Sequence, residues 1–271
     1  MTKPRRQPAE VSRSERLGRL EIRVDREGIK LMAHGTLYAV LPPTPEATPP
    51  PWLALAAAPW IPEGGLLDHP IGLLGYGGGT VARLLRGASP KVEIVGVDLD
   101  AEVLRLGRRH LKSAVRGVTI EQAEAREWLA RPGPRFGAIL DDLYAPKGGW
   151  LARPADLVDV PELARRRLVA GGVYAVNLRS PSGQVEKQIM IRIRRAFRQI
   201  RVIHTLEYAH KVVVATDRPI HAGALKWALS RLLEPTARHD SLLGRPGFGS
   251  PRMLGFRPMR RLPHHSNRHK T

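Results

Sequence analysis

The chain contains no cysteine among its 271 residues. This absence excludes disulfide bonds, thiol catalysis and metal sites built from thiolates, and it fits a cytoplasmic protein. The chain also lacks any uninterrupted run of eighteen apolar residues, so no transmembrane helix is predicted. Residues 1–26 are charged throughout and contain no apolar segment of the kind found in signal peptides. We therefore expect a cytoplasmic protein that makes no contact with a membrane.

Several motifs that would indicate other chemistries are also missing. No GxSxG, Walker-type phosphate loop or zinc-ligand spacing occurs, and the ten histidines form no HxH. Their one HxxxH spacing, His265 to His269, lies close to the C-terminus. Three of these histidines lie near the C-terminus, at His264, His265 and His269. The sequence therefore predicts no metal site.

Composition and charge indicate one large α/β domain with basic ends. Apolar residues make up 42% of the chain, enough for a substantial core, and the net charge is +19. Residues 1–30 hold nine Lys/Arg against five Asp/Glu, and residues 218–271 hold eleven against two. Such a tail can bind polyanions, but it has no aromatic spacing for stacking on bases. We favour a solvated, disordered tail over a tail that binds nucleic acid. Nucleic-acid binding through this tail stays an open alternative.

A glycine loop followed at a fixed distance by a carboxylate is the most informative pattern in the chain. The apolar residues 71–74 are typical of a buried parallel strand, and Gly75, Gly77 and Gly79 provide a tight turn before a helix that starts at Thr80. Asp98 lies nineteen residues after Gly79, at the end of a second apolar run. At this spacing a carboxylate accepts hydrogen bonds from ribose hydroxyls. The layout predicts a nucleoside-binding site.

The glycines follow a GxGxG pattern, which argues against a pyrophosphate-binding dinucleotide fold. It favours a ligand that lays its nucleoside and amino-acid parts over the turn, and S-adenosylmethionine is such a ligand. The alternative is that the loop serves only as a tight connection between a strand and a helix.

From residue 71 onward, strand and helix patterns alternate as a doubly wound sheet requires. Helices are predicted over 101–112 and 184–198. The last two strands are joined by only three residues, too few for a parallel crossover, so they must form an antiparallel hairpin. The predicted fold is a Rossmann-like seven-stranded α/β sheet with an antiparallel last strand, its strands at the ranges 71–75, 92–98, 118–121, 136–141, 172–178, 201–207 and 211–216.

Four segments are predicted along the chain. Residues 1–16 form a basic, disordered N-terminus, and residues 17–62 form a small β-hairpin followed by a proline-rich linker or lid. The prolines between 42 and 51 exclude a helix or a central strand, whereas residues 52–60 are apolar and fit a helix beside the ligand cleft. Residues 63–236 form the nucleoside-binding domain, and residues 237–271 form the disordered basic tail.

Over about residues 20–217 the chain resembles the spermidine synthase (polyamine aminopropyltransferase) branch of the class I S-adenosylmethionine-dependent methyltransferases. The resemblance rests on the N-terminal hairpin and on the motifs at 74–80, 97–100, 136–146 and 168–178. It implies S-adenosylmethionine or its decarboxylated form as the cofactor. Aligned on Pro146, the family's catalytic aspartate falls on Asp142. The family's adenine-binding aspartate falls on Glu124, which can accept the same hydrogen bond or can be a solvated loop residue.

Two departures from the family pattern concern the acceptor. The family's second aspartate, which holds the substrate amine, is replaced by Ala145, and the tyrosine-bearing gate segment is replaced by the proline-rich run. Since side chains alternate along a strand, only one of Asp141 and Asp142 can face the cleft. We expect Asp142 to do so as the catalytic group, and Asp141 is kept as a substitute substrate anchor. Tyr144 and Asn177 are further candidates for contact with the substrate.

These features favour a spermidine synthase-like transferase that moves a methyl group from S-adenosylmethionine to a small molecule. The alternatives are an aminopropyltransferase that uses the decarboxylated cofactor, and a nucleoside-binding homologue without catalysis. Assembly as a homodimer stays open.

Overall fold

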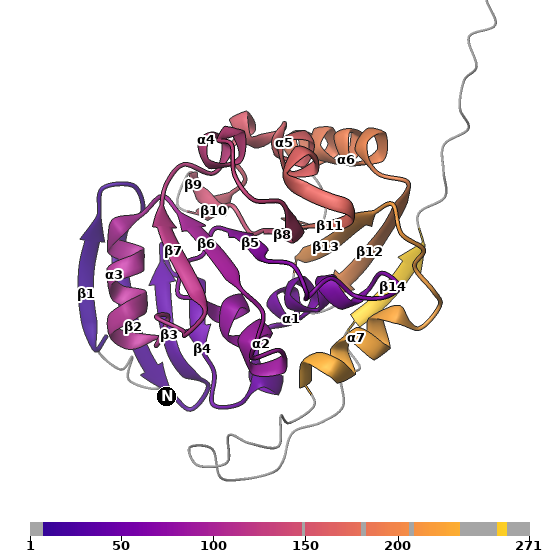
Figure 1. Cartoon of the computed structure of the whole chain (residues 1–271). Coiled ribbons are helices and arrows are strands. Elements are labelled where there is room, and N and C mark those ends of the chain that lie inside the picture. The colour runs from indigo at the N-terminus through magenta and orange to yellow at the C-terminus, as the bar shows by residue number, and fades with distance from the viewer. Residues whose placement is uncertain (1–7, 148–149, 180–182, 206–208, 234–253, 259–271) are drawn as a thin grey trace, which may run out of the picture.

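The computed structural model describes residues 8–147, 150–179, 183–205, 209–233 and 254–258. They form a central mixed sheet with helices on both faces and a separate antiparallel sheet near the N-terminus (Figure 1). No helix in these ranges is long and apolar enough to cross a lipid bilayer.

The central sheet contains the predicted seven strands in the order β7-β6-β5-β8-β11-β13-β12. The strands from β7 to β11 are parallel, whereas β13 is antiparallel to both β11 and β12. This arrangement confirms the Rossmann-like fold and its antiparallel last strand. The bounds are β5 (Ile71–Leu74), β6 (Ile94–Asp98), β7 (Val118–Gln122), β8 (Phe136–Asp141), β11 (Leu168–Arg179), β12 (Gln199–Thr205) and β13 (His210–Thr216).

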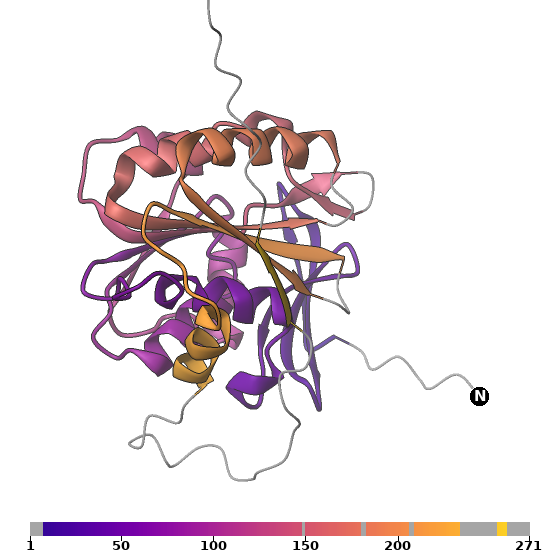
Figure 2. The ribbon, with the colours of Figure 1, turned by 90° about the vertical axis from the view of Figure 1, so that its right-hand side faces the viewer.

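Helices cover the two faces of this sheet (Figure 2). One face packs against α1 (Pro50–Ala57), α2 (Thr80–Ala88) and α7 (Ala224–Leu233). The other packs against α4 (Ala125–Ala130), α5 (Val160–Arg167) and α6 (Gln184–Ala196), with the short helix η3 (Ala155–Leu157) before α5. The predicted helices correspond to α6 and to α3 (Ala101–His110), which end within two residues of the expected positions.

The N-terminal sheet has four antiparallel strands: β1 (Glu10–Ser14), β2 (Gly18–Asp25), β3 (Gly28–Ala33) and β4 (Thr36–Leu41). The predicted hairpin is β2 and β3, and its apolar side chains pack against α3. Strand β4 was not expected. It follows a turn in which both His34 and Gly35 have positive φ, 50° and 71°, the conformation of a tight hairpin turn.

Strand β1 corrects the prediction of disorder over residues 1–16 for the range Glu10–Ser14. The segment lacks apolar alternation, but two serine hydroxyls hold it in place: Ser14 donates to the Asp100 carboxylate and Ser12 donates to Glu102. These partners lie at the start of α3, more than 80 residues away in sequence. A pattern based on hydrophobicity cannot detect a strand that is fixed by such polar contacts.

The proline-rich segment also differs from expectation at its end. Pro50 and Pro51 form the first turn of α1, where a missing N–H costs no hydrogen bond and the fixed φ suits a helix. The helix η1 (Pro45–Ala47) precedes α1 and η2 (Ala58–Trp60) follows it. As predicted, residues 52–60 are mostly helical and pack on the core beside the candidate site. The Trp52 side chain, which was not predicted as a site residue, lines that site.

Two further pairings lie outside the predicted elements. Strands β9 (Ala145–Lys147) and β10 (Trp150–Ala152) form a short antiparallel pair after β8. Strand β14 (Leu254–Pro258) pairs with the outer edge of β12, so the expectation of disorder over 237–271 is corrected for these five residues. The rest of that tail, including His264, His265 and His269, lies outside the described residues.

Candidate active site

The glycine loop connects β5 to α2 as predicted. Gly75, Gly77 and Gly79 have φ values of 76°, 56° and 74°, a left-handed conformation that residues with a Cβ rarely adopt. At Gly75 a Cβ would also lie 2.6 Å from the carbonyl oxygen of Asp142. Because β5 and β8 are parallel neighbours, and the Asp142 N–H donates to Leu74 O at 2.9 Å, this packing brings the loop beside the end of β8.

Asp98 ends β6 beneath this loop and is only 5% exposed. Its carboxylate accepts hydrogen bonds from the N–H groups of Gly77, at 2.7 Å, and Asp100, at 3.0 Å. Burial raises the pKa of Asp98 to about 6, although the backbone donors oppose that rise. The carboxylate thus fixes the glycine loop from below and is not among the side chains that line the cavity described next.

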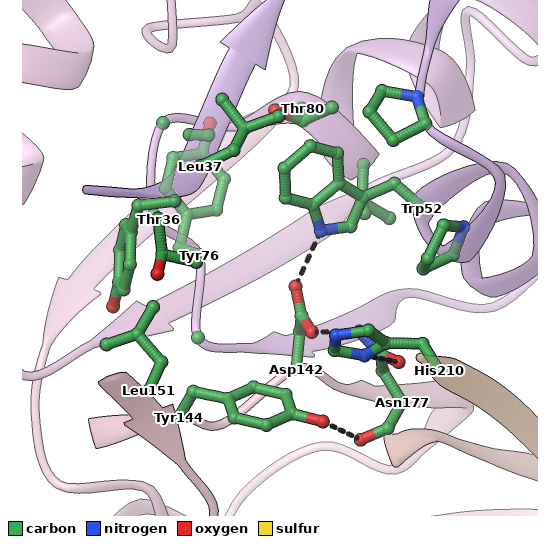
Figure 3. Close-up of a pocket in the computed structure, with 18 of the residues that line it drawn as sticks. Thr36, Leu37, Trp52, Tyr76, Thr80, Asp142, Tyr144, Leu151, Asn177 and His210 are labelled. Atoms are coloured by element: carbon green, nitrogen blue, oxygen red, sulfur yellow. Dashed lines mark hydrogen bonds between the residues drawn. The ribbon is translucent and has the colours of Figure 1, made fainter. Parts of the chain in front are cut away.

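A cavity of about 480 Å³ lies between the N-terminal sheet, the start of α1, the glycine loop and the ends of the central strands (Figure 3). Five predicted site residues line this cavity: Gly75 and Gly77 of the glycine loop, and Asp142, Tyr144 and Asn177. The remaining polar or aromatic residues of its lining are Thr36, Tyr38, Trp52, Tyr76, Thr80, Arg179 and His210.

Asp142 is held in the cavity by two donors from different elements. Trp52 donates its indole N–H to Asp142 Oδ2 at 2.8 Å, and Asn177 donates Nδ2–H to Asp142 Oδ1 at 2.8 Å (Figure 3). Burial raises the pKa of Asp142, and these two hydrogen bonds oppose the rise by favouring the ionised form. The arrangement presents a carboxylate, largely shielded from water, to the side of the cavity that faces the glycine loop.

Asn177 connects Asp142 to two further side chains. Its Oδ1 lies 2.9 Å from His210 Nδ1, and its backbone oxygen accepts the Tyr144 hydroxyl at 3.1 Å. Burial raises the pKa of Tyr144 and lowers that of His210. Both groups are therefore uncharged near neutral pH.

Asp141 faces away from the cavity, which corrects its prediction as a substrate anchor. It is 0% exposed and forms a bidentate ion pair with the buried Arg153. The Tyr174 hydroxyl also donates to it. Because side chains alternate along a strand, only one of the two aspartates was expected to face the cleft. In the structure Asp142 faces the cavity and Asp141 is buried in the core.

Like Asp98, the predicted cofactor residues Glu124 and Gly79 lie outside the cavity lining. Glu124 caps α4, accepting the N–H of Glu127 at 2.8 Å. A Cβ on Gly79 would lie 2.8 Å from the Tyr76 hydroxyl, so this glycine serves the packing beneath the loop. Contact of either residue with a ligand stays a prediction. No three His, Asp or Glu side chains cluster as metal ligands in the described part of the chain.

Two side chains of the hydrogen-bond network around Asp142 were not predicted as site residues. Trp52 was assigned only to an apolar segment beside the cleft, and its donor role depends on a carboxylate 90 positions away. His210 was assigned only to a hairpin connection. The start of β13 lies beside the end of β11, with Arg179 paired to His210, and this register brings the imidazole to Asn177. The signal available in the sequence was a polar residue, His210, at the start of a strand predicted to pair with the strand that carries Asn177.

No model of a known protein family matches the chain. In sequence, it is 27% identical over 194 residues to the polyamine aminopropyltransferase of Synechococcus sp. strain JA-3-3Ab, an alignment that covers 69% of this chain and 56% of the relative. The chain spans about half the length of the curated relatives it matches first.

Solved structures show the same fold. A probable spermidine synthase from Corynebacterium glutamicum ATCC 13032 superposes with a TM-score of 0.65 at 21% identity, covering 92% of this chain and 100% of that one. Human methyltransferase-like protein 13 in complex with SAH gives a TM-score of 0.54 at 18% identity, covering 74% and 93%. Together, the sequence and fold likenesses support the resemblance that the motifs indicate, a spermidine synthase-like chain with a methyltransferase-type fold.

Proposed function

We propose that this chain is a transferase that moves an aminopropyl group from decarboxylated S-adenosylmethionine to an amine. The observation that carries the proposal is the placement of Asp142: one carboxylate, oriented by Trp52 and Asn177, faces the glycine loop across a single cavity. The relatives named polyamine aminopropyltransferase support an amine as the acceptor and aminopropyl as the group.

The residues around the glycine loop fit an adenosyl sulfonium donor. Gly75, Gly77 and Gly78 present backbone without side chains to the cavity, and Asp98 holds the loop from below. We assign the ribose hydroxyls to Asp98 and the adenine amino group to Glu124, so the donor must extend past the lining described above, which includes neither side chain. The donor supplies an electrophilic carbon: the amine lone pair forms the new C–N bond, and the electrons of the broken C–S bond stay on sulfur.

The cavity wall beside the loop favours the decarboxylated donor over S-adenosylmethionine itself. A donor with a carboxylate needs a cation near the loop. Arg83 on α2 hydrogen-bonds to the loop, and its guanidinium donates to the carbonyls of Gly78, Val40 and Leu111 at 2.6–2.7 Å. Arg179, the cation of the cavity lining, lies at the end of β11 beside His210. The cavity wall beside the loop is apolar, formed by Leu37, Ala39 and Val81. Burying a carboxylate there would cost its hydration without an ionic partner.

Asp142 attracts the ammonium form of the acceptor and orients it toward the donor. Charge attraction of this kind is strong in a cavity shielded from water. Trp52 and Tyr144 add aromatic walls that restrict the position of the amine. Holding the nitrogen and the electrophilic carbon in one geometry is the main requirement of an in-line displacement. Methyl transfer, which the loss of the second aspartate at Ala145 had favoured, is the second candidate.

The test is to measure methylthioadenosine from decarboxylated S-adenosylmethionine in the presence of putrescine, spermidine or agmatine, and S-adenosylhomocysteine from S-adenosylmethionine with the same amines. We expect methylthioadenosine, with its formation lost in Asp142→Asn and kept in Asp156→Asn, an exposed carboxylate on η3. S-adenosylhomocysteine as the sole product would establish methyl transfer instead. If calorimetry shows that neither donor binds, both functions are wrong.

A further inference from the structure

His210 lies at the start of β13, and its imidazole lines the cavity beside Asn177 (Figure 3). Two contacts fix it there: Nδ1 lies 2.9 Å from Asn177 Oδ1, and the backbone oxygen accepts the Thr205 hydroxyl at 2.7 Å. The ring of Tyr144 packs edge-on against the imidazole with 5.8 Å between the ring centroids. This histidine is therefore a positioned group of the site, although the function proposed above gives it no role.

The chemistry of its neighbours determines which nitrogen carries the proton. The indole of Trp52 can only donate, and Asp142 as a carboxylate can only accept. Asn177 must therefore turn its NH₂ toward Asp142, which leaves Oδ1 as an acceptor toward His210. An acceptor at that position requires a proton on Nδ1. In the neutral imidazole the lone pair is then on Nε2.

We infer that His210 is a second proton acceptor of this site and takes, through Nε2, the proton that the acceptor amine must lose; this inference rests on the function proposed above. The acceptor arrives as R–NH₃⁺ and passes one proton to Nε2, giving R–NH₂ and an imidazolium. The freed lone pair of R–NH₂ attacks the donor carbon, and the imidazolium later returns its proton to solvent. The hydrogen bond from Nδ1–H to Asn177 persists throughout, because the imidazolium donates from both nitrogens.

The groups around His210 suit this role. Asp142 and Tyr144 approach from the end of β8, Arg179 from β11 and Trp52 from α1, while Glu186 on α6 acts on Tyr144 and on the adjacent Lys211. Burial lowers the pKa of His210, and the charge of Arg179 lowers it further. The imidazole is therefore unprotonated at neutral pH and able to accept a proton. Asp142, whose two oxygens already accept from Asn177 and Trp52, is left as the electrostatic anchor.

The first test does not depend on activity. Two-dimensional ¹H–¹⁵N correlation of the histidine side chains at pH 7.5, with the His210 signals assigned by their loss in His210→Asn, reports the tautomer directly. We expect His210 as the Nδ1–H tautomer. An Nε2–H tautomer, or an imidazolium at that pH, would overturn the inference and leave the proposed function standing.

The second test separates proton transfer from positioning. In His210→Asn the amide NH₂ takes the place of ring Nδ1 and keeps the hydrogen bond to Asn177, but no base remains. We expect kcat for methylthioadenosine formation to fall about 100-fold, the contribution typical of a general base, with little change in the KM of the amine. The matched control is His204→Asn, a histidine on the neighbouring strand β12 that does not line the cavity.

The outcomes of these tests are distinct. An unchanged kcat in His210→Asn, or equal losses in both variants, would overturn the role of His210. A raised KM with unchanged kcat would reduce His210 to a residue that positions the amine. No methylthioadenosine from the wild-type protein would overturn the proposed function, and the role of His210 with it.

Discussion

Asp141 and Asp142 are adjacent in the chain, but their carboxylates lie in opposite environments. Asp141 points into the core and forms a bidentate pair with Arg153, whereas Asp142 points into the cavity and accepts from Trp52 and Asn177. The buried pair also anchors the chain that follows β10, and Leu151 of that strand forms part of the cavity wall. The end of β8 thus combines a structural carboxylate with a candidate catalytic one.

Removing one partner of the buried pair should destabilise the protein strongly. In Asp141→Leu the Arg153 guanidinium keeps its buried position without a counter-charge, and we expect a loss of about 3–5 kcal/mol in the free energy of unfolding measured by urea titration. The double variant Asp141→Leu/Arg153→Met should recover much of that loss. Asp159→Asn, in the partly exposed pair with Arg126, is the control and should have little effect. A double variant no more stable than the single one would contradict the assignment of the pair.

The burial of Asp98 predicts a pH dependence of stability. Its pKa in the folded protein is about 6, above the ordinary value of 3.8, so folding favours the protonated form. The resulting stabilisation is fully present below about pH 4 and is lost as the pH rises through 6. Between pH 4 and pH 7.5 the wild type should therefore lose on the order of 2 kcal/mol relative to Asp98→Asn.

The measurement is the difference in unfolding free energy between the wild type and Asp98→Asn at several pH values. Asp68→Asn, at an exposed carboxylate, controls for the change in net charge. A difference that is independent of pH would show that Asp98 has an ordinary pKa.

Trp52→Phe should shift the acidic limb of the pH–rate profile to higher pH. The substitution keeps an aromatic ring but removes the N–H that favours ionised Asp142, and the pKa of Asp142 should rise further. Activity that needs the carboxylate would then require a higher pH. Steady-state rates of methylthioadenosine formation across pH 5–8 would show the shift. Trp60→Phe, at a buried tryptophan outside the cavity lining, should leave the limb in place.

Two truncations at the C-terminus should separate the contribution of β14 to stability from that of the residues after it. A chain that ends at Pro258 keeps the pairing with β12, and we expect its stability and donor affinity to match those of the full chain. A chain that ends at Leu233 lacks β14 and exposes the edge of β12. Five cross-strand pairs predict a loss of roughly 1–3 kcal/mol in unfolding free energy, with donor affinity kept. Equal stability of the two truncations would show that β14 contributes nothing to the fold.

The sequence by itself determined the central sheet, the antiparallel last strand and the glycine loop. These features depend on local patterns: apolar runs of strand length, glycines where φ must be positive, and a connection too short for a crossover. The same patterns place Asp142 at the mouth of a strand, because the register of parallel neighbours follows from the βαβ connections.

Only the tertiary structure decided how the side chains of the site meet. Strand β1 depends on Ser14 reaching Asp100, the donor to Asp142 comes from Trp52, and the imidazole of His210 reaches Asn177 across an antiparallel pair. Each contact joins residues at least 33 positions apart through single hydrogen bonds. Such bonds leave no periodicity in the sequence, because their geometry depends on how whole elements pack.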